Sequence, residues 1–211
     1  MSILEKDSTE SKLLLQYIKN SHNKSIRKIM RINRPEEELN KNSGGRHVLL
    51  FHGTKTFNVL GILAAGLQVS PMESPQTGSA YGNGIYFADK FSLALNYTGT
   101  NLFYNNYNHY GSSNEKFYVF VCEVDLGRTL VIKTHKDNSN LTSSGIKNYD
   151  SVSVLGNQRP NDDERFVMND GVEIPLGKEK NYEYKSSASY DSQYVALSEK
   201  QVKLRYLVEL N

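Results

Sequence analysis

The segment that most constrains the fold is the run Phe117–Val124, which reads FYVFVCEV. β-Branched and aromatic residues fill most of it, and such residues favour the extended backbone of a β-strand. It is the clearest strand pattern in the sequence. We therefore expect a fold organised around a sheet that contains this segment.

Shorter strands are predicted at residues 26–32, 48–51, 84–88, 193–197 and 202–210. Because side chains alternate between the two faces of a strand, the final segment should turn one set of apolar residues to one side. That set is Val202, Leu204, Tyr206, Val208 and Leu210.

Helices are predicted to be few and short. An apolar stripe at helical spacing marks residues 8–21, and Ser8 or Thr9 can cap this helix. The stripe consists of Leu13, Leu14, Tyr17 and Ile18. Two further helices are expected at 57–67, ending near Gly66, and near 90–97.

The remaining segments are predicted as loops. They are 35–45, 70–79, a Tyr/Asn-rich surface insert at 97–115, and 133–170 with short strands at most. Many short strands with few helices predict an α+β fold with a mixed or antiparallel two-sheet core. We expect a single domain, in which an N-terminal helix, strand and loop (1–46) lead into the core (47–211).

Composition narrows the functional classes. The chain has 211 residues, of which 38% are hydrophobic and 23% charged, as is ordinary for a soluble protein. A net charge of +2 is too small to indicate nucleic-acid binding. Cys122 is the single cysteine, so an internal disulfide is impossible. No membrane-length apolar run or secretion signal is recognisable, and we expect an intracellular monomer.

The segment Gly82–Asp89, GNGIYFAD, is the first candidate motif. It is no phosphate loop, because the Lys-Ser/Thr ending is missing and a strand follows where a helix should. It is no dinucleotide fingerprint either, because the third glycine and the βαβ context are absent. Alone, it indicates only a turn that enters a strand.

The second candidate is Leu50–Thr54, LFHGT, in which His52 stands at a strand end. Alone, this histidine would be interpreted as structural. Metal binding is not expected, because the other histidines stand in no ligand spacing with it and the cysteine lies within a strand. We predict no metal site.

Together the motifs are more specific. The order His52-Gly53-Thr54, then 84–88 (GIYFA), then Asn96-Tyr97 resembles the catalytic domain of the poly(ADP-ribose) polymerase family. The resemblance extends over nearly the whole chain, and the ending QVKLRYL (201–207) is similar to the DNA-dependent branch. Weaker matches are 151–152, 155–156, 170–172 and 175–177. We expect the helical regulatory domain of that branch to be absent.

The resemblance implies NAD⁺ as co-substrate and a role for each matching residue. Gly53 would let its backbone approach the nicotinamide carboxamide, and Tyr97 and Tyr86 would stack on the two faces of the ring. His52 would hydrogen-bond a hydroxyl of the adenosine ribose, with Thr54 beside it. Ala88 lies in the same motif and is expected to line the NAD⁺ site.

The sequence departs from the family pattern at the position of the catalytic glutamate, which is Gln193 here. Glutamine can hydrogen-bond a ribose hydroxyl, but it carries no charge and cannot act as a base. A natural variant and a deliberate substitution both fit. A Lys-Ser pair of the polymerases is replaced by Leu93-Ala94, which favours mono- over poly-ADP-ribosylation.

We therefore expect a catalytic set of His52, Tyr86 and Gln193 that transfers ADP-ribose from NAD⁺ to a protein or nucleic-acid acceptor. Two alternatives are an inactive module that binds NAD⁺ or ADP-ribose and an NAD⁺ glycohydrolase. Asp191 and Glu199, the nearby carboxylates, are expected to be solvated at the surface.

Overall fold

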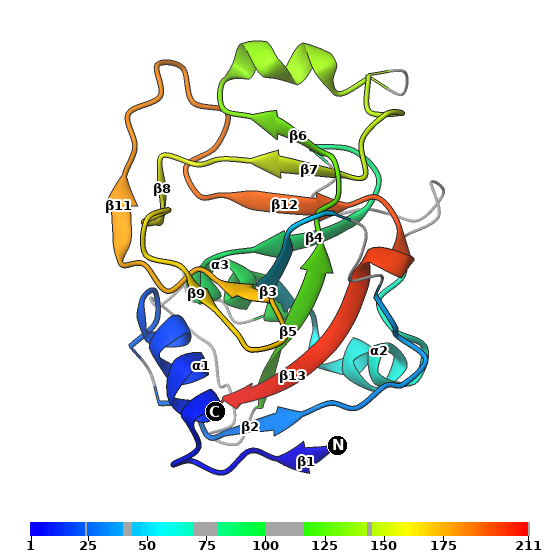
Figure 1. Ribbon diagram of the computed structural model, residues 1–211, viewed down its shortest axis with the longest axis vertical. Coiled ribbons are helices and arrows are strands. Elements are labelled where there is room, and N and C mark those ends of the chain that lie inside the picture. The colour runs from blue at the N-terminus through cyan, green and yellow to red at the C-terminus, as the bar shows by residue number, and fades with distance from the viewer. Residues whose placement is uncertain (24, 40–43, 70–79, 100–115, 143–144, 211) are drawn as a thin grey trace, which may run out of the picture.

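The computed structural model describes residues 1–23, 25–39, 44–69, 80–99, 116–142 and 145–210. Most of its strands join one sheet (Figure 1). In spatial order these strands are β1 (Ser2–Ile3), β2 (Lys28–Arg31), β13 (Val202–Leu210), β5 (Phe117–Asp125), β3 (His47–Gly53), β4 (Ile85–Ala88), β12 (Gln193–Ala196), β7 (Ser151–Val154) and β6 (Thr129–Ile132).

All neighbours in this order are antiparallel except β6 and β7, which are parallel. A short hairpin of β9 (Phe166–Val167) and β10 (Glu173–Ile174) adds to β3, with β10 parallel to it. Strands β8 (Gln158–Pro160) and β11 (Glu179–Asn181) form a separate two-stranded ribbon. The predicted α+β fold with a mixed, mostly antiparallel sheet and few short helices is confirmed.

The predicted central strand is β5, and it lies between β13 and β3. Its residues from Val119 to Val124 are fully buried, and their apolar side chains alternate between two cores. Val119 and Val121 pack into one core, whereas Phe120, Cys122 and Val124 pack into the other. This double burial explains why the segment is apolar at nearly every position.

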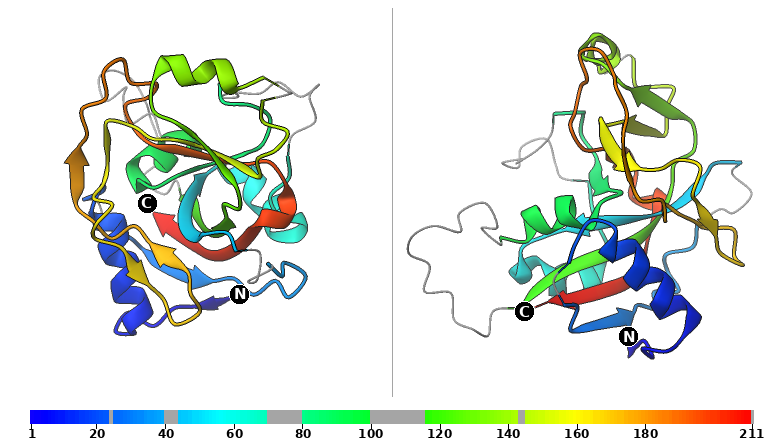
Figure 2. Two further views of the ribbon diagram at one scale, coloured as in Figure 1. Left: turned by 45° about the horizontal axis from the view of Figure 1, so that its top comes forward. Right: turned by 90° about the vertical axis from the view of Figure 1, so that its left-hand side faces the viewer.

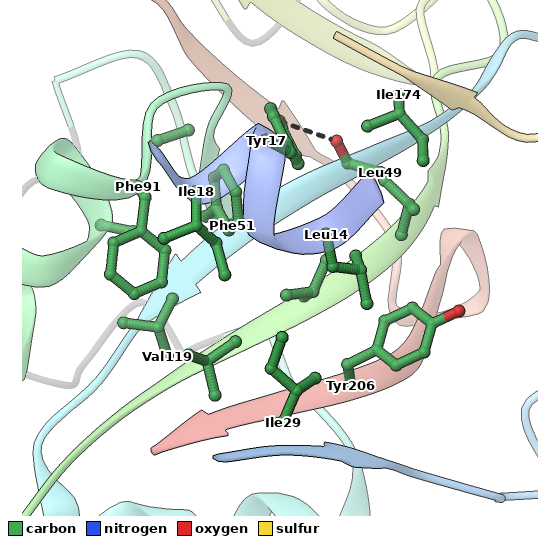
Figure 3. Packing of buried hydrophobic residues seen from close by; sticks show 14 of the residues in the cluster. Leu14, Tyr17, Ile18, Ile29, Leu49, Phe51, Phe91, Val119, Ile174 and Tyr206 are labelled. Atoms are coloured by element: carbon green, nitrogen blue, oxygen red, sulfur yellow. Dashed lines mark hydrogen bonds between the residues drawn. The ribbon is translucent and has the colours of Figure 1, made fainter. Parts of the chain in front are cut away.

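Helix α1 (Thr9–Lys19) covers one face of the sheet, as the apolar stripe predicted (Figure 3). Ser8 caps it by accepting a hydrogen bond from the amide of Ser11. The ring of Tyr17 stacks on Phe51 with centroids 4.2 Å apart. The Tyr17 hydroxyl donates a 3.0 Å hydrogen bond to the carbonyl of Leu49. These contacts fix the helix against β3, the strand that leads into the motif His52–Gly53.

The other helices are very short. They are η1 (Thr56–Asn58), α2 (Val59–Ala65), α3 (Phe91–Leu95), η2 (Asn96–Thr98), η3 (His135–Asn140) and η4 (Glu199–Gln201). Helix α2 ends at Gly66, whose φ of 81° is the backbone conformation that glycine adopts freely. Among the described residues no helix has the length and apolar character of a membrane span.

The expectation of one apolar face along 202–210 was wrong. A register shift between Leu204 and Tyr206 marks a β-bulge in β13. The extra residue reverses the alternation, so Val202 and Leu204 pack into one core, whereas Tyr206, Val208 and Leu210 pack into the other. Both labelled chain ends lie in the lower part of the molecule in the right-hand view of Figure 2, and β6 lies in the upper part in Figure 1.

Four predicted loops fall partly or wholly outside the described residues. The parts concerned are residues 40–43 of the loop after Pro35, the segment 70–79, residues 100–115 of the Tyr/Asn-rich insert, and residues 143–144 of the segment 133–170.

Candidate active site

A cavity of about 760 Å³ opens where β3 and β4 separate. The two strands pair only at Phe51 and Ala88, and the chain beyond each pairing point forms a wall of the cavity. Helices α2 and α3, the turn η2 and the first residue of β12 complete the lining. The volume lies within the range of sites that hold small organic ligands.

All the site residues predicted from the sequence line this one cavity. They are His52, Gly53, Thr54, Tyr86, Ala88, Tyr97 and Gln193. Leu93 and Ala94, the positions that depart from the family pattern, line it as well. Segments that are far apart in the sequence therefore meet at a single concave surface.

His52 is held in one tautomer by the neighbouring strand. Its Nδ1 lies 2.9 Å from the backbone carbonyl oxygen of Tyr86. A carbonyl only accepts hydrogen bonds, so Nδ1 carries the proton and Nε2 is an acceptor. Burial lowers the pKa of His52, and the hydrogen bond to the Tyr86 carbonyl opposes this only in part. The ring is therefore neutral at pH 7 and offers a lone pair to a hydroxyl donor.

Tyr86 is also held through its polar end. Its hydroxyl donates to the carbonyl of Gly82 at 2.7 Å and accepts from the amide of Tyr81 at 3.0 Å. Burial raises the pKa of Tyr86 to about 12, so the hydroxyl stays neutral. Tyr97, on η2, is 48% exposed and presents its ring at the same cavity. The Tyr86 ring is thus fixed by its hydroxyl group, and the Tyr97 ring is open to a ligand.

Gly53 is required by helix packing. A Cβ atom at this position would lie 1.7 Å from the carbonyl oxygen of Ala94 in α3. No side chain fits there, because real Cβ contacts are never so short. The glycine therefore allows α3 to pack against the end of β3, which brings Ala94 and the following turn to the cavity wall.

Gln193 begins β12 and lies directly opposite Ala88 of β4. Tyr86 pairs with Val195 in the same ladder, so Tyr86 and Gln193 are diagonal neighbours on one face of the sheet. Thr54 is buried, and its Oγ1 accepts a 3.0 Å hydrogen bond from Asn58 of η1.

The cavity lining carries few charged side chains among the described residues. None of the described residues that line the cavity is an aspartate or glutamate, and Lys55 supplies the one formal charge among them. The described part of the cavity therefore contains no ionised base. No group of three or more potential metal-ligating side chains lies together in the described part of the chain.

Sequence reasoning missed the cavity wall formed by η1 and α2. Phe57 of η1 and Gly61 and Ile62 of α2 line the cavity, and Phe57 is 77% exposed. In the sequence this segment is an apolar helix without a polar side, and the pattern alone does not separate its covered face from its open one.

The expectation of a solvated Asp191 was also wrong. Its Oδ1 accepts a 2.7 Å hydrogen bond from Nζ of Lys90, and its side chain is only 24% exposed. Glu199 is exposed, and its carboxylate accepts a hydrogen bond from the amide of Val69.

Comparison with known proteins places these residues in a family context. Residues 8–211 match the family described as the poly(ADP-ribose) polymerase catalytic domain. Poly [ADP-ribose] polymerase 2 of Zea mays is 30% identical over 219 residues, which cover 99% of this chain and 31% of the relative. Poly [ADP-ribose] polymerase 1 of Danio rerio is 32% identical over 221 residues, which cover 100% of this chain and 20% of the relative. The chain thus spans between a fifth and a third of the length of these relatives.

Proposed function

Because the chain belongs to the poly(ADP-ribose) polymerase catalytic-domain family, we propose that it binds NAD⁺ in the cavity between β3 and β4 and transfers ADP-ribose to a macromolecular acceptor. Nicotinamide leaves in this reaction, and the bond that breaks joins it to the ribose. The acceptor is a protein or nucleic acid. The observation that carries the proposal is the convergence of His52, Tyr86, Tyr97 and Gln193 on one cavity of suitable volume.

The proposed binding mode follows from the chemistry of the lining. The neutral His52 ring accepts a hydrogen bond at Nε2, which suits a ribose hydroxyl. The half-exposed Tyr97 ring offers a stacking surface for a pyridine ring, while the fixed Tyr86 forms part of the facing wall. Aromatic contacts of this kind contribute roughly 0.5–1.5 kcal/mol beyond area burial.

The described cavity lining offers no negative charge to stabilise the transition state of the proposed reaction, and this limits its rate. Breaking the bond between ribose and nicotinamide develops positive charge on the ribose, which a carboxylate would stabilise. Gln193 can hold a ribose hydroxyl by hydrogen bonding, but it neither balances this charge nor accepts a proton. No described residue of the lining replaces it. We therefore propose slow transfer of single ADP-ribose units, favoured by an acceptor that brings its own carboxylate.

The test is the variant Gln193→Glu, with Gln193→Ala as its matched control. Nicotinamide release and label transfer from radiolabelled NAD⁺ to protein are measured for all three proteins. We expect Gln193→Glu to raise the rate of nicotinamide release by roughly 10²–10⁴-fold, the usual contribution of a positioned base or electrostatic stabiliser. Gln193→Ala should fall to or below the wild-type rate.

Two outcomes would contradict the proposal in different ways. Absence of both nicotinamide release and labelled protein with every variant, despite NAD⁺ binding, would favour the second candidate, an inactive module that binds NAD⁺. The lack of a carboxylate in the described lining motivates this candidate. Absence of NAD⁺ binding in calorimetry would reject both functions.

A further inference from the structure

An ion cluster around the buried Lys90 lies close to Gln193, outside the cavity lining. Lys90 directs Nζ to Oδ1 of Asp191 at 2.7 Å and to Oε2 of Glu179 at 2.5 Å. The lysine side chain is only 9% exposed, whereas Asp191 and Glu179 are 24% and 36% exposed. One cation therefore connects two carboxylates that come from different parts of the chain.

The cluster lies just beyond the end of the β4–β12 ladder. The ladder ends at the pair of Gln193 and Ala88, and the two chains reach Asp191 and Lys90 two residues beyond it. The ion pair thus joins the ends of the two strands directly beside Gln193. Glu179, in β11, adds a third element to this connection.

Lys90 also starts helix α3. It is the residue that precedes the first helical position, and its carbonyl accepts the amide hydrogen of Ala94. Ala94 and Tyr97 line the cavity on this side. The backbone of Lys90 therefore begins the helix that forms one wall of the cavity. Its side chain binds Asp191, which lies two residues before Gln193 in the opposite wall.

The positive charge of Lys90 balances the negative charges of Asp191 and Glu179. Burial lowers the pKa of Lys90, but the hydrogen bonds to Asp191 and Glu179 outweigh this, and the net result is a raised pKa. The lysine is therefore charged at pH 7. Without it, two carboxylates would face each other near the buried carboxyl of Asp89, and their repulsion would separate the elements that they belong to.

We propose that Lys90 is a positioning residue for the donor site, which holds the Gln193 strand and the start of α3 at the separation that NAD⁺ requires. This inference rests on the proposed function. The lysine touches no ligand in this assignment and acts through Gln193, Ala94 and Tyr97.

The test compares Lys90→Met, which removes the charge and keeps the length, with Lys90→Arg, which keeps the charge. Glu209→Gln is the control, since Glu209 is a buried carboxylate on β13 that accepts from Arg27 and Lys28 away from the cavity. Two quantities are measured on folded protein: amide hydrogen exchange in β12 and α3, and affinity for NAD⁺ by calorimetry.

We expect Lys90→Met to speed exchange in β12 and α3 and to weaken NAD⁺ binding roughly 10-fold or more, as displacement of a site wall does. Lys90→Arg should restore both quantities to near the wild-type values. Glu209→Gln should lower the melting temperature without changing either quantity.

The proposal is overturned if Lys90→Met exchanges and binds like the wild type, or if Glu209→Gln weakens NAD⁺ binding to the same extent. A wild-type protein that binds no NAD⁺ would reject the proposed function. The exchange comparison would then still decide whether Lys90 holds the two elements together.

Discussion

The buried carboxyl of Asp89 makes the stability of the fold fall as pH rises, and a single substitution removes this dependence. Asp89 is 3% exposed, and its Oδ2 accepts a 3.1 Å hydrogen bond from the hydroxyl of Tyr194. Its Oδ1 is buried without a hydrogen-bond partner among the described residues. Burial raises the pKa of Asp89 to about 7, and the Tyr194 hydrogen bond and the charge of Lys90 offset this only partly. Asp191 and Tyr17 complete the ionisable surroundings.

The magnitude follows from linkage. In the unfolded chain Asp89 has a pKa near 3.8, so between about pH 4 and pH 7 the unfolded state ionises while the folded state stays protonated. The folded state is favoured fully below the unfolded pKa, and this advantage is lost as pH rises through the folded pKa. A rise from 3.8 to about 7 corresponds to about 4 kcal/mol at most.

Asp89→Asn removes this titration, so it should stabilise the protein at pH 8 by up to about 4 kcal/mol relative to its effect at pH 4. Urea unfolding of both proteins at several pH values between 4 and 8 measures the difference. Asp137→Asn is a control of opposite sign, because the amides of Lys133 and Thr134 lower the pKa of the partly exposed Asp137. An Asp89→Asn effect that is the same at pH 4 and pH 8 would refute the buried, protonated carboxyl.

Three further substitutions test close packing and a buried hydrogen bond. Gly53→Ala should lower the unfolding free energy by about 3 kcal/mol or more, because the new Cβ overlaps the carbonyl oxygen of Ala94. At Gly61 a Cβ meets nothing within 4 Å, so Gly61→Ala should raise the unfolding free energy by about 0.5–1 kcal/mol. Equal effects of the two in urea unfolding would contradict the assigned clash. Tyr17→Phe should cost about 1–2 kcal/mol, because the buried carbonyl of Leu49 loses its hydrogen bond; an unchanged melting temperature would contradict it.

Local sequence patterns predicted much of the fold. The strand at 117–124 and the helix at 8–21 were visible because burial imposes a strong pattern on each. The site residues could be grouped because His52, Tyr86 and Gln193 belong to recognisable motifs, and all three line one cavity.

What the sequence did not predict depends on contacts between distant segments. The bulge after Leu204 adds a residue without any local signal, because the sequence alternates as a regular strand would. The partner of Asp191 is Lys90, about a hundred positions away, and neither residue indicates the other. Gly53 was expected to let the backbone approach the nicotinamide carboxamide. In the structure the absence of a side chain at Gly53 makes room for the carbonyl oxygen of Ala94. The bulge, the ion pair and the close contact at Gly53 all depend on which distant segments pack together, and this is seen only in the folded chain.

The bulge in β13 has a consequence for cooperativity. Because the strand reverses its faces at that point, Val202 and Leu204 before the bulge lie in one core, and Tyr206, Val208 and Leu210 after it lie in the other. Neither core can open locally without pulling on the same backbone, so the two should melt as a single unit. A ligand that stabilises one wall of the cavity would therefore slow fluctuations on both faces of the sheet at once.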